Sequence, residues 1–318
     1  MGDWDHSRDH ELTLVFNDMT TKRWVVGAMT GTSIDGIDVV LVEIIGSGLD
    51  MRVSCACAKS CDMSPDLSKR LRDFADKDNA MTAKELTVLQ KDFSQLHIDA
   101  IRELLNSAGT NQSSIDLISV HGQTVYHSPP FLSMQLFTPA PLAHEFNTTV
   151  VCDLRAADIA AGGEGAPLTP LADYVLFRDH EGKEMRAIVN LGGFCNITIL
   201  SGDNTDTKTD NNTVDEKCVK GFDVCACSQL LDTIARNRLN CSYDEDGNAA
   251  LAGVSNESIV NELTNKLREQ SLKGRSLGTF DSPAQWISLY DTTSGNDIAA
   301  SACDAIAIVM KEKLDNLP

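Results

Sequence analysis

Residues 151–170 read VCDLRAADIAAGGEGAPLTP. A short apolar strand is predicted at 149–152, and two carboxylates and one guanidinium follow it within six residues, as Asp153, Arg155 and Asp158. Three glycines then fall within four positions, and glycine lets the backbone adopt a positive φ or approach a ligand without an intervening Cβ. A carboxylate beside such a loop suits a general base that removes a proton from a bound hydroxyl or water. The alternative is a structural ion pair of Asp153 with Arg155 beside an ordinary glycine turn.

Two other stretches predict hairpins with glycine-rich turns. The first joins apolar runs at 24–29 and 37–45 through the turn Thr30-Gly-Thr-Ser-Ile-Asp-Gly36. The N–H and O–H groups of this turn can surround a phosphate, and its aspartates can hold a cation through water. No Gly-Lys-Ser/Thr follows, so the turn is not a Walker A loop. A surface hairpin built from favoured turn residues is the alternative.

The second hairpin is predicted at 186–200, where two apolar runs flank Gly192, Gly193 and Asn196. It repeats the strand, glycine turn and strand of the first hairpin. Two copies in two halves of one chain indicate a duplicated α/β fold with a phosphate held between the copies.

Other predicted elements surround these motifs. A capping box at Thr82 and Glu85 starts a helix that runs to Gly109. A buried strand at 115–120 leads into His121, Gln123 and Thr124, and open α/β folds bind ligands at the carboxyl ends of such strands. A satisfied structural histidine is the alternative for His121. The remaining predictions are a strand at 51–58 with Val53, Cys55 and Cys57 facing the core, helices at 65–77, 167–178, 258–267 and 298–314, a helix opened by 221–228, a polar insertion at 201–216, and a domain boundary after residue 183.

Composition narrows the classes of partner. The chain of 318 residues has room for two domains. Its net charge of −19 argues against nucleic acid and anionic membranes as partners, because both require basic patches. No stretch approaches ~18 uninterrupted apolar residues, so no membrane span is predicted. Residues 1–20 read as an acidic polar tail unlike a signal peptide, which predicts a cytoplasmic protein.

The ten cysteines are predicted to be reduced thiols that behave as small hydrophobic residues. Cys55 with Cys57 and Cys225 with Cys227 leave a zinc site as an alternative. Their spacing lacks the two-residue gap of the usual zinc motifs.

Five blocks resemble the anhydro-N-acetylmuramic acid kinase family, which belongs to the superfamily of sugar kinases, actin and the heat-shock ATPases. The blocks are Gly31-Thr-Ser-Ile-Asp-Gly-Ile-Asp38, His121-Gly-Gln-Thr124, Asp153-x-Arg-x-x-Asp158 with Gly162-Gly-x-Gly-Ala-Pro-Leu168, Asn190-x-Gly-Gly-x-x-Asn196, and Gly221-Phe-Asp223. The resemblance implies an α/β fold of the duplicated ribonuclease-H-like, actin-like ATPase kind with an interdomain cleft. The polar tail at 1–20 would precede a first domain at 21–183 and a second at 184–318.

The resemblance also implies a reaction. Water would attack the anomeric carbon of 1,6-anhydro-N-acetylmuramic acid, with Asp158 as the catalytic base. The γ-phosphoryl group of ATP would pass to the freed O6, giving N-acetylmuramic acid 6-phosphate in the recycling of peptidoglycan.

Roles for further residues follow from the same resemblance. ATP phosphates would bind Gly31, Thr32, Ser33, Ile34, Asp35, Gly36, Ile37 and Asp38 in the first hairpin, and Gly192, Gly193 and Asn196 in the second. Mg²⁺ would be held by Asp35 through water. The sugar would contact His121, Gln123, Thr124, Arg155, Gly163 and Asp223. The partner is thus a small sugar, with neither nucleic acid nor membrane, and a homodimer is possible.

Two departures from the family pattern affect these expectations. Residues 224–228 read Val-Cys-Ala-Cys-Ser where the family has Thr-Gly-Pro-Gly-Asn, which places bulkier groups in a loop near the ligand. The sequence also stops before the family's Gly-Gly-Gly-x-x-Asn segment for adenosine, which predicts weak nucleotide binding with little discrimination between ATP and GTP. A catalytically impaired relative that binds a sugar or a partner protein is the alternative function.

Overall fold

The computed structural model describes residues 21–31, 34–75, 80–179, 181, 183–201, 218–272, 276–290 and 292–317. Its first sheet has the strand order β3-β2-β1-β4-β7. β1 (Lys22–Met29), β2 (Gly36–Ile45) and β3 (Arg52–Asp62) are antiparallel neighbours, which confirms the first predicted hairpin. β4 (Leu117–Val120) lies parallel to β1, and β7 (Val150–Val151) lies parallel to β4.

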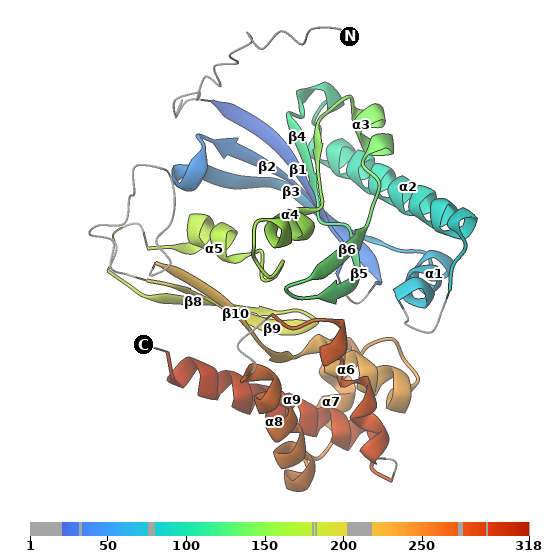
Figure 1. Cartoon of the computed structure of the whole chain (residues 1–318), viewed down its shortest axis with the longest axis vertical. Helices are drawn as coiled ribbons and strands as arrows, with labels where there is room; N and C mark the ends of the chain where they lie inside the picture. The colour runs from blue at the N-terminus through green and yellow to red at the C-terminus, as the bar shows by residue number, and fades with distance from the viewer. Residues whose placement is uncertain are drawn as a thin grey trace, which may run out of the picture.

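One face of the first sheet is covered by α2 (Ala83–Ala108), as Figure 1 shows. The residues buried in this contact alternate along the strands and include Val26, Ala28, Ile37, Val39 and Leu41. The predicted capping box begins α2, since the Thr82 hydroxyl accepts the N–H of Glu85 and the Glu85 carboxylate accepts the N–H of Thr82. Gly109 ends the helix at φ 61°, in the left-handed region that glycine adopts without penalty. α1 (Pro65–Ala75) and α3 (Ala140–Phe146) lie against α2.

The prediction that Val53, Cys55 and Cys57 all face the core was wrong for Cys55, while Cys57 packs against the core of the first half. The pairing of β2 with β3 shifts between Leu41 and Val42, so the two-residue alternation breaks at this point. Cys55 is exposed, while Val53 and Cys57 are half-buried.

The second sheet, of order β10-β9-β8, repeats the arrangement β3-β2-β1 of the first. β8 (Arg186–Leu191), β9 (Phe194–Leu200) and β10 (Val219–Ala226) are antiparallel neighbours, which confirms the second hairpin and the duplicated α/β fold. The helices that pack with this sheet are α6 (Ser228–Ile234), α7 (Asn248–Ala252), α8 (Glu257–Ser271) and α9 (Gly295–Asp315). The helix predicted from residue 221 begins only at Ser228, because residues 219–226 pair with β9.

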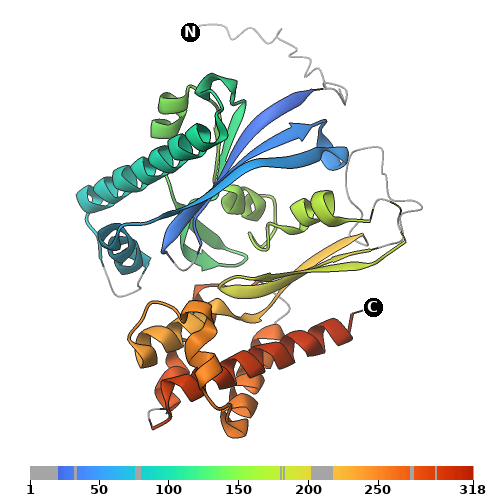
Figure 2. The same cartoon turned by 180° about the vertical axis from the view of Figure 1, so that it is seen from behind.

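Two short helices and a hairpin lie between the two sheets, as Figure 2 shows from behind. They are α4 (Leu154–Ala160), α5 (Pro170–Phe177) and the hairpin of β5 (Gln123–Ser128) with β6 (Leu132–Leu136). α5 lies against strands of both sheets. The Thr198 hydroxyl of β9 donates to Asp173 of α5 at 2.6 Å, and Arg178, which follows α5, pairs with Asp50 in the turn between β2 and β3 at 3.5 Å. The domain boundary after residue 183 stays a prediction.

Two further predictions concern the described helices and one loop. Among the helices that the structure describes, none is long and apolar enough to cross a membrane. The polar insertion predicted at 201–216 lies, apart from Ser201, outside the described residues.

Candidate active site

Asp158 lies on α4, and the glycine loop that follows surrounds its carboxylate. The N–H of Gly165 donates to Asp158 Oδ2 at 2.7 Å, and the N–H of Gly163 donates to the Asp158 carbonyl at 2.9 Å. A Cβ on Gly163 would lie 2.2 Å from Asp158 Oδ2, so only glycine leaves room for the carboxylate here. Asp158 is exposed. One carboxylate oxygen is therefore fixed, while the side chain stays accessible to a bound water or hydroxyl.

Arg155 precedes Asp158 by about one helical turn and is tied to two other segments. Its Nη1 donates to the Gly165 carbonyl at 2.6 Å, and its Nε donates to His121 Nε2 at 3.0 Å. Because His121 Nε2 accepts this bond, Nδ1 carries the ring proton and donates to the Gly122 carbonyl at 2.9 Å. Burial and the positive charge of Arg155 lower the pKa of His121 to about 4. The imidazole is therefore neutral near pH 7 with both nitrogens engaged, which agrees with the alternative of a satisfied histidine.

The charges of Arg155 on α4 and Asp223 on β10 act on one another across the two halves. Burial lowers the pKa of Arg155, and the Asp223 carboxylate acts in the opposite direction. Burial likewise raises the pKa of Asp223, against the bonds from Leu277 and Ser276 and the charge of Arg155. Each charge therefore favours the ionised form of the other group, against the effect of burial.

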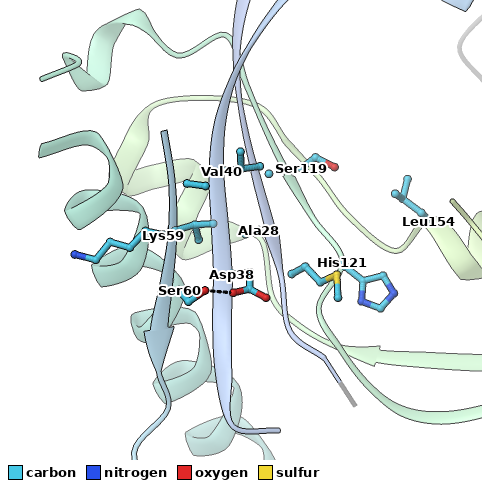
Figure 3. Close-up of a pocket in the computed structure, with 12 residues that line it drawn as sticks. Ala28, Asp38, Val40, Lys59, Ser60, Ser119, His121 and Leu154 are labelled. Carbon is cyan, nitrogen blue, oxygen red and sulfur yellow. Dashed lines mark hydrogen bonds between the residues drawn. The ribbon is translucent and has the colours of Figure 1, made fainter. Parts of the chain in front are cut away.

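A cavity of about 430 Å³ lies beside His121, between α4 and the first sheet (Figure 3). Apolar groups make most of its wall, including Met29, Val40 and Leu154. Its polar side chains include Asp38 and Ser60, whose hydroxyl donates to Asp38 Oδ1 at 2.5 Å. A residue predicted for phosphate, Asp38, and one predicted for the sugar, His121, therefore line the same space.

Gln123 supports the turn of the first hairpin. Its side chain is fully buried, and its Nε2 donates to the Gly31 carbonyl at 3.2 Å. Thr124 is half-buried and accepts a hydrogen bond from Gln135 Nε2 of β6 at 3.4 Å. The predicted contacts of Gln123 and Thr124 with a sugar stay predictions.

The rest of the first hairpin combines strain, packing and exposed charge. Thr32 and Ser33 lie outside the described residues. Ile34 has φ 55°, a strained value for a β-branched residue, although its side chain is buried in the core. A Cβ on Gly36 would lie 2.8 Å from the Cys61 carbonyl, so the approach of β3 explains this glycine without a ligand. Ile37 is buried in the core.

Asp35 is the exposed carboxylate at the end of this turn, and it acts on α6 of the other half. Burial raises the pKa of Asp232 on α6, the charge of Arg236 lowers it, and the charge of Asp35 raises it further. The charge of Asp35 in the first half therefore acts on a carboxylate of the second half.

The second hairpin leaves space at its turn. Beyond the adjoining residues, the nearest atom to a Cβ on Gly192 would be the Phe194 carbonyl oxygen at 3.5 Å, which is ordinary contact. The carbonyls of Gly192 and Gly193 accept the N–H groups of Ser228 and Gln229, which joins the turn to the start of α6. Asn196 pairs in register with Asn190 on one side and Asp223 on the other. Two separate sequence blocks thus form one row across the three strands.

The departure at residues 224–228 is explained by packing. Val224, Cys225, Ala226 and Cys227 are buried in the core of the second half. They belong to a strand and its junction with α6, so their side chains fill the core. Cys55 and Cys57 lie in the other sheet, and the described residues contain no group of three or more His, Cys, Asp or Glu suited to a metal ion.

The strand orders β3-β2-β1 and β10-β9-β8, each containing a hairpin with a glycine-rich turn, define a duplicated α/β protein of the ribonuclease-H-like kind. Residues 23–278 match the family model of anhydro-N-acetylmuramic acid kinase. The chain belongs to the anhydro-N-acetylmuramic acid kinase family.

Individual relatives agree with this assignment. An anhydro-N-acetylmuramic acid kinase of Bacillus cereus (strain B4264) is 33% identical over 248 residues, covering 76% of this chain and 60% of that protein. Another, of Bacillus cereus (strain AH187), is 29% identical over 285 residues, covering 86% of this chain and 71% of that protein. The chain thus spans about 60% of the length of the first of these relatives.

Solved structures give weaker similarity. Component A of (R)-2-hydroxyglutaryl-CoA dehydratase from Acidaminococcus fermentans matches 93% of this chain and 80% of its own, with a TM-score of 0.38 and 10% identity. A Ppx/GppA family member from Aquifex aeolicus matches 94% of this chain and all of its own, with a TM-score of 0.33 and 9% identity.

Two residues of this region carried no role in the sequence-based prediction. Glu164 is the residue x of the block Gly162-Gly-x-Gly, to which the family pattern assigns no residue type. Ser276 lies in a loop 112 positions further along the chain, and the backbone N–H of Ser276 donates to Glu164 Oε2 at 2.5 Å. The glycine at 278 was the one local signal that the backbone of this loop approaches another segment.

Proposed function

We propose that this chain is an ATP-dependent kinase that converts 1,6-anhydro-N-acetylmuramic acid and water to N-acetylmuramic acid 6-phosphate. The observation that carries the proposal is Asp158, an exposed carboxylate whose Oδ2 is held by Gly165 on a loop between the two halves. Membership of the family supplies the substrate class. ATP-dependent recycling of a cell-wall sugar places the protein in the cytoplasm.

Asp158 accepts a proton from water as the water oxygen bonds to the anomeric carbon, and the bond from that carbon to O6 breaks. The freed O6 attacks the γ-phosphorus of ATP, and ADP leaves. Positioning of the reactants supplies most of such catalysis, which suits a carboxylate fixed at one oxygen.

Other residues of the chain would orient the reactants. The cavity beside His121 offers apolar wall and the Asp38 carboxylate to the bound molecules. Arg155 places a fixed positive charge one turn from Asp158, and the hydrogen bond to His121 holds the Arg155 guanidinium in its orientation. Gly192 leaves room for phosphate oxygens to approach the backbone of the second hairpin.

Mg²⁺ fits the carboxylate at the first hairpin. Asp35 is exposed, and carboxylates are ligands that Mg²⁺ accepts directly or through water. Asp35 would hold the hydrated ion, which supplies neutralisation of phosphate charge when bound.

Product analysis tests the proposal. The chain is incubated with Mg²⁺, ATP and either 1,6-anhydro-N-acetylmuramic acid or N-acetylmuramic acid, and products are identified by mass spectrometry. We expect ADP and N-acetylmuramic acid 6-phosphate in equal amounts from the anhydro sugar. Release of ADP without a sugar phosphate, or phosphorylation of the already hydrolysed sugar alone, would overturn the proposal.

A further inference from the structure

Residues 276–281 form a strap that crosses from the second half of the molecule to the first. Ser276, Leu277 and Gly278 are buried. A Cβ on Gly278 would lie 2.4 Å from the His127 carbonyl, so the strap backbone packs directly on β5. The ring of Phe280 stands nearly perpendicular to that of Tyr126, with centroids 6.1 Å apart.

The other side of the strap is anchored to the second sheet. Asp223 Oδ2 accepts the N–H of Leu277 at 2.7 Å and the hydroxyl of Ser276 at 3.1 Å. Gln270 of α8 donates to the Asp281 carbonyl at 2.7 Å and accepts the N–H of Ala226 at 2.9 Å. Hydrogen bonds therefore tie the strap to β10 and α8.

Glu164 connects this strap to the loop around Asp158. Its Oε2 accepts the N–H of Ser276 at 2.5 Å. The next residue, Gly165, donates its N–H to Asp158 and accepts Arg155 through its carbonyl. The carboxylate of Glu164 is thus one residue away from both contacts that hold the proposed base and its neighbouring guanidinium.

We propose that Glu164 is a positioning residue, which fixes Gly165 and thereby the carboxylate of Asp158 by accepting the Ser276 amide. The inference rests on the proposed function, since it assigns Glu164 to the orientation of the same base. The requirement is for an acceptor oxygen, because the donor is a backbone N–H. Glutamine retains such an oxygen at the same distance from the backbone, and alanine does not.

Three variants separate this role from a general effect on folding. Glu164→Ala removes the acceptor, Glu164→Gln keeps it, and Ser276→Ala removes the hydroxyl that contacts Asp223 while keeping the backbone N–H. Each is measured for kcat, for the KM of ATP, and for amide hydrogen exchange in residues 158–165 and 276–278. Melting temperatures identify any variant that fails to fold.

We expect Glu164→Ala to lower kcat by roughly tenfold with the KM of ATP unchanged, and to accelerate exchange in both segments. Glu164→Gln and Ser276→Ala should stay within about twofold of the parent in kcat. Faster exchange in 276–278 without a change in 158–165, or an equal loss of kcat in the Gln variant, would overturn the assignment. A parent chain without kinase activity would refute the proposed function, while hydrogen exchange would still test the link from Glu164 to the loop.

Discussion

Arg155 Nε donates to His121 Nε2 at 3.0 Å, so a neutral imidazole holds the guanidinium that precedes Asp158. The second ring nitrogen is used by the Gly122 carbonyl. His121 therefore acts on Arg155 and has no free nitrogen with which to exchange a proton with a substrate.

The titration of His121 tests this arrangement. Its pKa of about 4 means that the ring is neutral throughout the range from pH 6 to 8. In NMR spectra of histidine-labelled protein, we expect a midpoint near 4 for His121 and the tautomer protonated at Nδ1. Arg155→Met should raise that pKa, because the variant removes the nearby positive charge. A midpoint near 6.5 in the parent would contradict the hydrogen bond from Arg155.

A second histidine should make stability depend on pH. His97 is fully buried in α2 beside Phe93 and Phe137, and burial lowers its pKa from 6.5 to about 4, against the bond to the Phe93 carbonyl. The unfolded state binds more protons between these values, so the stabilisation is complete above pH 6.5 and is lost as the pH falls through about 4. The loss at about pH 5 is on the order of 2 kcal/mol from His97 alone.

Urea unfolding at pH 7.5 and pH 5 measures this dependence. In His97→Leu, the difference in the free energy of unfolding between the two pH values should be smaller than in the parent by about that amount. Parent and variant with the same difference would show that His97 does not contribute.

Two glycines that the sequence treats alike should respond differently to alanine. At Gly36 the new Cβ would lie 2.8 Å from the Cys61 carbonyl, and we expect a loss of about 1–3 kcal/mol in the free energy of unfolding. At Gly192 the nearest atom beyond the adjoining residues is 3.5 Å away, so Gly192→Ala should melt within a few degrees of the parent while binding ATP more weakly. Scanning fluorimetry and calorimetry compare the pair. Destabilisation by Gly192→Ala, or unchanged ATP binding in that variant, would show that Gly192, like Gly36, has only a structural role.

Local signals in the sequence predict much of this fold. The capping box at Thr82, the terminating Gly109 and the two glycine hairpins depend on residues near one another in the chain, and all are confirmed. Cys55 was placed wrongly because a shift in strand pairing cannot be read from two-residue alternation. The helix that carries Asp158 was not predicted, since its seven residues are too few for a helical period to be distinguished.

Some residues of the candidate site can also be predicted from sequence motifs, while others are revealed only by the tertiary structure. The sequence blocks select Asp158, Arg155, His121 and Asp223, and the structure brings their segments together. The contact of Glu164 with Ser276 joins positions that are 112 residues apart through a backbone N–H, for which no residue type is required. The burial of Gln123 also depends on tertiary packing, which a polar residue type does not reveal.

The central claim is that Asp158 is the general base, and Asp158→Asn tests it most directly. The amide oxygen of asparagine can still accept the N–H of Gly165, so the loop should keep its shape while the side chain can no longer take up a proton. We measure turnover of 1,6-anhydro-N-acetylmuramic acid with ATP, and binding of the sugar by calorimetry. The account predicts a fall in kcat of roughly 10²–10⁴-fold with sugar binding retained. Turnover equal to that of the parent would contradict it.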